Sequence, residues 1–203
     1  PLLESEKLTF SRPQLLATAL ETGGGKVPMK DIEATMQAQV RWGQLLNVPV
    51  AHGHGNDLLS SRQTWDAEKS ILTKVLEGKE AVAPLMDNVP GSLMTDLTSG
   101  QRASTRMILE TTDRFTVVQG YAGVGKTTQF RAVTGAISLL PEATRPRVIG
   151  LGPTHRAVGE MQSAGVDAQT TASFLHDTQL LQRNGQTPDF SNTLFLLDES
   201  SMV

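Results

Sequence analysis

The sequence contains no cysteine among its 203 residues, and aromatic residues make up only 4% of it. Without cysteine the chain can form neither disulfides nor thiolate metal sites, so a reducing cytoplasm is compatible with it and is the location we expect. Long apolar runs are also absent, because none approaches the ~18 residues of a membrane-spanning helix. The N-terminus shows no signal-peptide pattern. We therefore expect no membrane insertion.

A strong excess of positive charge is absent as well. The formal net charge is −3 at pH 7, which argues against a protein whose whole surface attracts nucleic acid but leaves room for a local basic groove. The length suits one or two domains and allows a proper hydrophobic core.

A glycine-rich stretch, FTVVQGYAGVGKTT at 115–128, dominates the sequence. Gly120, Gly125, Lys126 and Thr127 match the P-loop pattern G-x-x-x-x-G-K-[ST]. The glycines let successive backbone N–H groups turn toward phosphate oxygens, Lys126 supplies a charge for the β- and γ-phosphates, and Thr127 a hydroxyl for Mg²⁺. The residues expected to contact the nucleotide are Gly120, Tyr121, Ala122, Gly123, Val124, Gly125, Lys126, Thr127 and Thr128.

The flanking sequence distinguishes a P-loop from a turn with chance glycines. Phe115, Val117 and Val118 predict a strand before the loop. After it, Phe130, Val133, Ile137 and Leu140 recur at i, i+3, i+7 and i+10, which predicts a helix. A strand before and a helix after are what a nucleotide-binding P-loop requires.

A second motif, LFLLDES, places Asp198 and Glu199 after an apolar run. In a doubly wound sheet, ligands bind at the carboxyl ends of the strands, so these acids would face the P-loop. Asp198 would hold Mg²⁺, and Glu199 would orient and deprotonate the attacking water. Alone, such an acidic pair is a weak signal, but together with the P-loop it indicates hydrolysis rather than binding only.

From residue 97 onward, helix and strand patterns alternate. We expect helices at 99–111, 155–163 and 170–182, and buried strands at 147–152 and 194–197. This order is typical of an α/β protein with a parallel sheet covered on both faces. The two prolines and mixed polarity of 79–96 indicate a boundary, so we predict a helical accessory domain at 1–95 and the start of a RecA-like P-loop domain at 96–203.

The first domain is expected to be mostly helical. Ser11 and Pro13 suit the start of one helix, and Pro28 precedes a second, while 42–50 reads as a short β-like excursion. This order resembles a winged-helix module, but a structural domain without DNA contact is the interpretation we favour.

Residues 51–61 are expected to be a loop, in which His52 and His54 suit a flexible turn better than a metal site. A further helix is predicted at 64–77. Its expected buried face consists of Ile71, Leu72, Val75 and Leu76.

Gln101 has two interpretations. In LTSGQR, Thr98 and Gln101 form an S/T-x-x-E/Q capping box, which by itself explains both residues. An amide also offers a donor and an acceptor for adenine, so a nucleotide contact is equally compatible with the residues alone.

Five segments resemble, in order, helicase motifs Q, I, Ia, Ic and II of the RecD-like group of superfamily-one 5′-to-3′ DNA helicases. They are LTSGQ (97–101), GYAGVGKTT (120–128), GLGPTHRAV (150–158), TTASFLH (170–176) and LDESSM (197–202). Within that group, the chain is similar to the relaxase-helicases of F-like conjugative plasmids, and residues 1–95 resemble the helical segment before their helicase core.

The resemblance implies roles for individual residues. It implies an adenine contact for Gln101, phosphate and magnesium contacts for Lys126 and Thr127, and metal-holding and water-activating roles for Asp198 and Glu199. Contacts with single-stranded DNA are implied for Pro153, Thr154, His155 and Thr170. By themselves, Thr154 and Thr170 would be read only as helix caps.

The implied function is ATP-dependent 5′-to-3′ movement along single-stranded DNA, with ATP and Mg²⁺ as cofactors. Counterparts of the later motifs, including an arginine worth ~10³–10⁵ in rate, are missing from these residues. We therefore expect a fragment that binds nucleotide but hydrolyses it weakly, with the remaining motor domain and an N-terminal relaxase domain as partners. An ATP-binding switch and a DNA-recruitment module, with residues 1–95 holding the strand, are the alternatives.

Overall fold

The structure is a computed structural model that describes residues 8–49, 58–120 and 125–200. The chain divides into two units, Pro1–Glu77 and Gly78–Val203. In the part of the chain that the structure describes, no helix combines the length and the apolar character needed to cross a membrane.

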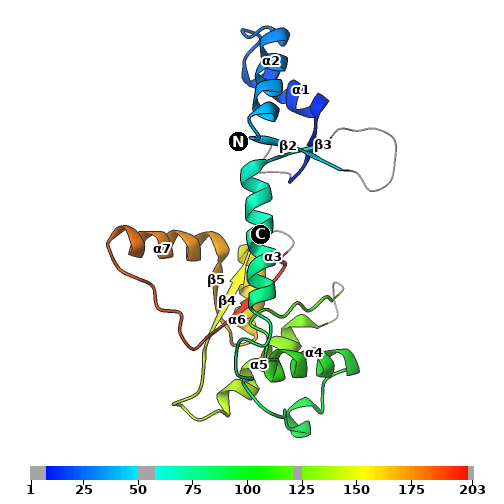
Figure 1. The fold of residues 1–203 in the computed structure, drawn as a ribbon. Coiled ribbons are helices and arrows are strands. Elements are labelled where there is room, and N and C mark those ends of the chain that lie inside the picture. The colour runs from blue at the N-terminus through cyan, green and yellow to red at the C-terminus, as the bar shows by residue number, and fades with distance from the viewer. Residues whose placement is uncertain (1–7, 50–57, 121–124, 201–203) are drawn as a thin grey trace. The chain divides into compact units, whose positions relative to one another are not determined.

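In its described residues, 8–49 and 58–77, the first unit combines three helices with a small antiparallel sheet (Figure 1). Its strands are arranged in the order β1-β3-β2, and its core consists of Phe10, Met36, Leu45 and Leu59. The elements are β1 (Phe10–Ser11), α1 (Arg12–Thr22), α2 (Met29–Arg41), β2 (Leu45–Val48), β3 (Leu58–Ser61) and α3 (Arg62–Glu77).

The start of α1 confirms the predicted cap. The Ser11 hydroxyl accepts from the backbone N–H of Gln14, and the Gln14 side chain accepts in return from the backbone N–H of Ser11. Pro13 lies in the first turn, where its missing N–H costs no helical hydrogen bond. The same reciprocal motif joins Thr98 and Gln101 in the second unit.

Strand β2 lies where a β-like excursion was expected, but the expectation of a loop through residues 51–61 is wrong at its end. Residues 58–61 form β3, which pairs with β2 in antiparallel register, with Asn47 opposite Leu59. The glycines and histidines before β3 dominate the local sequence signal, whereas Leu59 is drawn into the core and is fully buried. His52 and His54 lie outside the described residues.

Helix α3 forms as predicted, but its apolar stripe is not buried. Ile71, Leu72 and Leu76 are 59%, 63% and 68% exposed, and Val75 is exposed as well. The helical spacing of these residues predicts a face suited to burial. Burial itself depends on a second element lying against that face, and periodicity carries no information about one.

Among the residues of the second unit that the structure describes, three strands form a parallel sheet in the order β5-β4-β6 (Figure 1). It confirms the α/β class and the parallel sheet predicted from sequence. The elements of the unit are the 3₁₀ turn η1 (Gly91–Met94), α4 (Ser99–Glu110), α5 (Lys126–Ser138), β4 (Arg147–Gly152), α6 (His155–Ser163), β5 (Asp167–Thr170), α7 (Thr171–Arg183) and β6 (Thr193–Leu197). Strand β5, whose DAQT sequence carries no apolar alternation, was not predicted.

Helices α6 and α7 cover opposite faces of this sheet. Leu196 of β6 belongs to the buried cluster that contains Met161 of α6. The next residue back, Phe195, points to the other face because neighbouring strand residues alternate, and its ring lies 5.5 Å from that of Phe174 in α7.

Gly150 lies in β4 at a point where α6 and the residues after it pack closely against the sheet. A β-carbon at Gly150 would lie 2.8 Å from atoms of Met161, Val166 and Ala168. Such a separation is well inside van der Waals contact, so the close packing of α6 onto the sheet depends on a residue without a side chain.

We expect Gly150→Ala to destabilise the second unit, because the methyl group forces three packed side chains apart. Overpacking of this kind costs about 1–3 kcal/mol. Gly159→Ala is the matched control: Gly159 lies in α6 with open space around it, so alanine should stabilise the helix by about 0.5–1 kcal/mol. Urea unfolding of both variants measures the difference, and equal stability would contradict the packing argument.

The strand predicted at Phe115–Val118 is not formed, and that prediction is wrong. Residues 115–120 are irregular, and Val117 is 85% exposed. A strand exists through hydrogen bonds to a neighbour, and these residues pair with none of the three described strands of the sheet. Their β-branched composition therefore does not suffice to make them one.

Residues 78–95 pack with the second unit. Val89 and Met94 belong to the same buried cluster as Leu97, Leu109 and Val133. The division after Glu77 thus lies earlier in the chain than the domain boundary expected after residue 95.

Candidate active site

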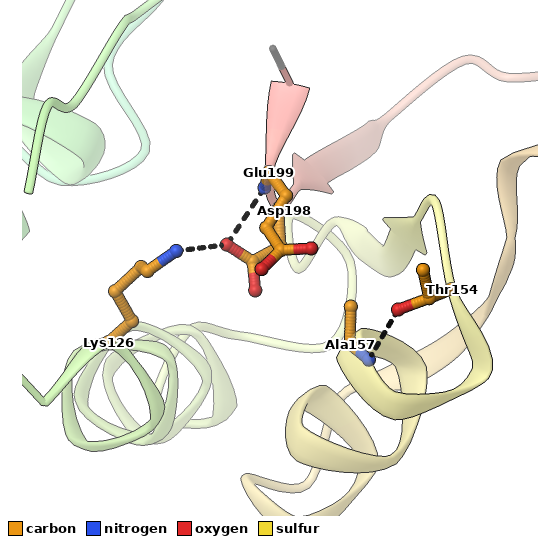
Figure 2. Close-up of polar contacts among 5 residues, drawn as sticks. All are labelled: Lys126, Thr154, Ala157, Asp198 and Glu199. Carbon is orange, nitrogen blue, oxygen red and sulfur yellow. Dashed lines mark hydrogen bonds and ion pairs between the residues drawn. The ribbon is translucent and has the colours of Figure 1, made fainter. Parts of the chain in front are cut away.

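The two sequence motifs meet at the carboxyl edge of the sheet. Asp198 directly follows β6, and its backbone N–H extends the parallel pairing by donating to the Leu151 carbonyl over 2.9 Å. Lys126 is the first residue of α5, and its Nζ lies 2.8 Å from Asp198 Oδ1. Figure 2 shows the lysine side chain extending from the start of α5 to this carboxylate. Residues separated by 72 positions along the chain are thereby brought into one site.

The ion pair sits at the boundary between protein and solvent, since the Lys126 side chain is 40% exposed and that of Asp198 only 8%. The hydrogen bond that Lys126 donates to Asp198 raises the pKa of Lys126 above its usual value. Burial opposes this effect, and the charges of Asp198, Glu199 and Glu160 add to it. Lys126 is consequently a permanent cation at neutral pH. Its ammonium group is paired with the Asp198 carboxylate, and its side chain is exposed enough to contact a second anion as well.

Glu199 lies next to this pair in an unusual backbone conformation. Its φ is 50°, in the left-handed region that a non-glycine residue seldom adopts. Its backbone N–H donates to Asp198 Oδ1 over 3.0 Å (Figure 2), while its side chain is exposed. The Asp198 carboxylate therefore accepts hydrogen bonds from both the Lys126 ammonium group and the turn that carries Glu199.

The described end of the P-loop also matches a phosphate site. Gly125 precedes α5 with a φ of 80°, and no side chain caps the helix there. The N–H groups of the first turn and the positive end of the helix dipole thus lie beside the Lys126 ammonium group, a combination that favours anions. Thr127 and Thr128 belong to this first turn. Gly120 is exposed and irregular, and the predicted contacts Tyr121, Ala122, Gly123 and Val124 lie outside the described residues.

We expect Gly125→Ala to weaken nucleotide binding about tenfold, corresponding to ~1.4 kcal/mol. The left-handed conformation costs alanine roughly 1–2 kcal/mol, and the new methyl would lie 2.6 Å from Gln101 Nε2. The measurement is a titration with a fluorescent ATP analogue in Mg²⁺. Gly135→Ala, an open position in the same helix, is the control and should bind like the unmodified chain; equal losses in the two variants would contradict the argument.

Gln101 forms the predicted capping box at the start of α4. The backbone N–H of Thr98 donates to Gln101 Oε1 over 2.9 Å, and the backbone N–H of Gln101 donates to the Thr98 hydroxyl over 3.3 Å. The same side chain donates from Nε2 to the Gly125 carbonyl over 3.2 Å. The capping interpretation is confirmed, and the adenine contact stays a prediction.

The four residues expected to contact DNA lie at the carboxyl ends of the neighbouring strands β4 and β5: Pro153, Thr154 and His155 follow β4, and Thr170 is the last residue of β5. Thr154 caps α6 by accepting from the Ala157 N–H over 3.2 Å (Figure 2), and Thr170 caps α7 by accepting from the Ser173 N–H over 3.1 Å. Gly152, just before Pro153, pairs with Thr170 in the sheet register. Pro153, Thr154, His155 and Thr170 therefore share the sheet edge that carries Asp198. Both caps are confirmed, whereas the DNA contacts stay predictions.

Sequence reasoning did not identify three features of this region. They are the bond from Gln101 to Gly125, the charge of Glu160 acting on Lys126, and the bond from Thr171 Oγ1 to the Gly152 carbonyl. These three interactions could not be predicted from sequence spacing, because each joins residues of different secondary-structure elements.

Comparison with known proteins identifies one matching family and two similar proteins that share one description. The family described as AAA domain matches residues 96–203. Over all 203 residues the chain is 68% identical to the "Multifunctional conjugation protein TraI" of Escherichia coli strain K12, and 66% identical to a protein of the same description from Escherichia coli. The chain spans only 12% of the length of each of these relatives.

Proposed function

Because this chain belongs to the AAA domain family, we propose that its second unit binds ATP and forms part of the motor of a 5′-to-3′ single-stranded DNA helicase. The observation that carries the proposal is the Lys126–Asp198 contact of 2.8 Å. It joins the two motifs that such a motor needs at the carboxyl edge of one parallel sheet.

In the proposed mechanism, Lys126 and the first-turn N–H groups of α5 bind the phosphates of ATP. The donors next to them suit Mg²⁺, which prefers a few hard protein oxygens together with phosphate oxygens. The Thr127 hydroxyl and the nearly buried Asp198 carboxylate would hold the ion, which when bound neutralises charge on the phosphates. Lys126 would exchange part of its contact with Asp198 for contact with phosphate.

Glu199 would act as the general base. Its side chain is exposed, as accepting a proton from an incoming water requires, and its backbone is fixed by the bond to Asp198. A base positioned in this way contributes about 10²–10⁴-fold to a proton-transfer step.

Single-stranded DNA would be held by Pro153, Thr154, His155 and Thr170. His155 and Thr154 are exposed, and Thr170 and Pro153 are half-buried. All four lie at the carboxyl edge of the sheet that also carries Asp198, so the DNA contacts would lie at the same edge as the nucleotide site. Movement along DNA would require closure against a second RecA-like domain.

The chain would work within a longer relaxase-helicase of plasmid conjugation. Identity of 66–68% to proteins named for conjugation supports this context. The partners would then be the remaining motor domain, an N-terminal relaxase domain and single-stranded DNA, with the cytoplasm as the place of action.

The test uses the longer polypeptide that carries this chain and two partial duplexes, one with a 5′ and one with a 3′ single-stranded tail. Displacement of the strand that depends on ATP and occurs only on the 5′-tailed duplex is the expected result. ATP binding without displacement would favour a nucleotide-dependent switch. Salt-sensitive DNA binding by the first unit alone, residues 1–77, without ATP-dependent displacement, would favour a recruitment module.

A further inference from the structure

Gln101 links two parts of the second unit that lie 24 residues apart. Its Oε1 accepts from Thr98, which fixes the start of α4, and its Nε2 donates to the Gly125 carbonyl at the start of α5. Both ends of one planar amide are thus engaged, so the position of one helix start determines that of the other.

The Gly125 carbonyl accepts two hydrogen bonds, one of them from Gln101 Nε2. The other comes from the Gln129 N–H over 3.2 Å and is the first hydrogen bond of α5. The Gln101 amide therefore contacts the peptide that joins the P-loop to the helix, directly before Lys126. Because the contact is partly buried, water competes with it less than at an open surface.

The space at this junction leaves little freedom. A β-carbon on Gly125 would lie 2.6 Å from Gln101 Nε2, so the amide fits against a backbone that lacks a side chain. Gly125 has a left-handed conformation, with a φ of 80°. If the peptide that follows Gly125 rotated, its carbonyl would lose the hydrogen bond from the Gln101 side-chain amide unless that amide moved as well. The arrangement suits a structural clamp on the P-loop.

We propose that Gln101 is a positioning residue that fixes the Gly125 peptide, and thereby the Lys126 ammonium and the first-turn N–H groups, for binding of a triphosphate. The inference rests on the proposed nucleotide-binding function and adds to it. Gln101 serves the phosphate end of the ligand, whatever nucleobase is attached.

An adenine contact and a phosphate-positioning role make different predictions. If Gln101 acts only by touching adenine, its loss weakens ATP but leaves inorganic tripolyphosphate unaffected. If it positions the P-loop, its loss weakens both ligands by a similar factor. One lost hydrogen bond of about 0.5–1.5 kcal/mol corresponds to roughly a threefold to tenfold loss of affinity.

The experiment measures binding of ATP and of tripolyphosphate, both with Mg²⁺, to this chain and three variants by calorimetry. Gln101→Met removes the cap acceptor and the bond to Gly125 without adding charge. Thr98→Val removes the hydroxyl of the same cap but keeps both bonds of the Gln101 side chain. Gln14→Met breaks the corresponding capping box of α1 and controls for loss of a cap elsewhere. The midpoint of thermal unfolding is recorded for every protein.

We expect Gln101→Met to lose about threefold to tenfold in affinity for both ligands, while Thr98→Val and Gln14→Met bind both like the unmodified chain. Three results would overturn the inference: a loss for ATP but not for tripolyphosphate, an equal loss in Thr98→Val, or no loss at all. If the unmodified chain binds neither ligand, the proposed nucleotide-binding function itself fails and the inference falls with it.

Discussion

Lys126→Ala is expected to remove measurable ATP binding. The substitution deletes the only side-chain cation that the described site places against Asp198, and with it the charge that phosphate oxygens would contact. Hydrogen bonds to charged groups are each worth about 1.5–3 kcal/mol. Loss of two such contacts would therefore lower the affinity by roughly 10²-fold or more. A titration with a fluorescent ATP analogue in Mg²⁺ provides the measurement.

Lys79→Ala is the matched control, because it removes the same charge from an exposed position. It should leave the affinity unchanged, apart from a small general electrostatic effect that added salt screens. Lys126→Ala leaves the nearly buried Asp198 carboxylate without this partner, so thermal unfolding must be recorded to separate lost binding from lost stability. Saturable ATP binding by folded Lys126→Ala at the original affinity would contradict the assigned site.

Glu199→Gln should leave ATP binding intact and reduce hydrolysis by about 10²–10⁴-fold. Glutamine keeps the shape of glutamate but cannot accept a proton from water. The substituted residue also keeps the backbone N–H that donates to Asp198, so the positions of Asp198 and Lys126 should not change. The measurement is single-turnover hydrolysis of ATP by the longer polypeptide with single-stranded DNA present.

Glu160→Gln is the control for charge. Glu160, like Glu199, acts on Lys126 through its negative charge, but it lies on α6 and is not proposed to touch water or substrate. The Glu160→Gln variant should hydrolyse ATP at nearly the rate of the unmodified protein. Equal losses in the two variants would mean that negative charge near Lys126, rather than proton transfer by Glu199, supports the reaction.

Local patterns predicted most of the helices and the residues of the proposed nucleotide site. Helix α6 was expected at 155–163 and is found at His155–Ser163, because Thr154 provides a cap and the apolar spacing is regular. The capping box of Thr98 and Gln101 formed for the same reason, since both of its bonds join residues three apart. The carboxylate of Asp198 could be placed near Lys126 because parallel strands present their carboxyl ends at one edge.

The errors concern features that depend on partners distant in sequence. Residues 115–118 have strand composition but pair with no described strand, whereas β5 has little strand composition and pairs with β4. The apolar face of α3 has the spacing of a buried face and remains exposed. Strand pairing and burial are properties of two elements together, so the sequence of one cannot decide them.

The amino-acid sequence by itself determined the helix caps and the P-loop and acidic patterns on which the proposed nucleotide chemistry rests, because these depend on spacing along the chain. The tertiary structure alone decided how those groups are held. It set Lys126 2.8 Å from Asp198, placed the Gln101 amide on the Gly125 carbonyl, and packed α6 against Gly150. Each of these contacts joins separate elements, and its distance follows from how those elements pack rather than from the local order of residues.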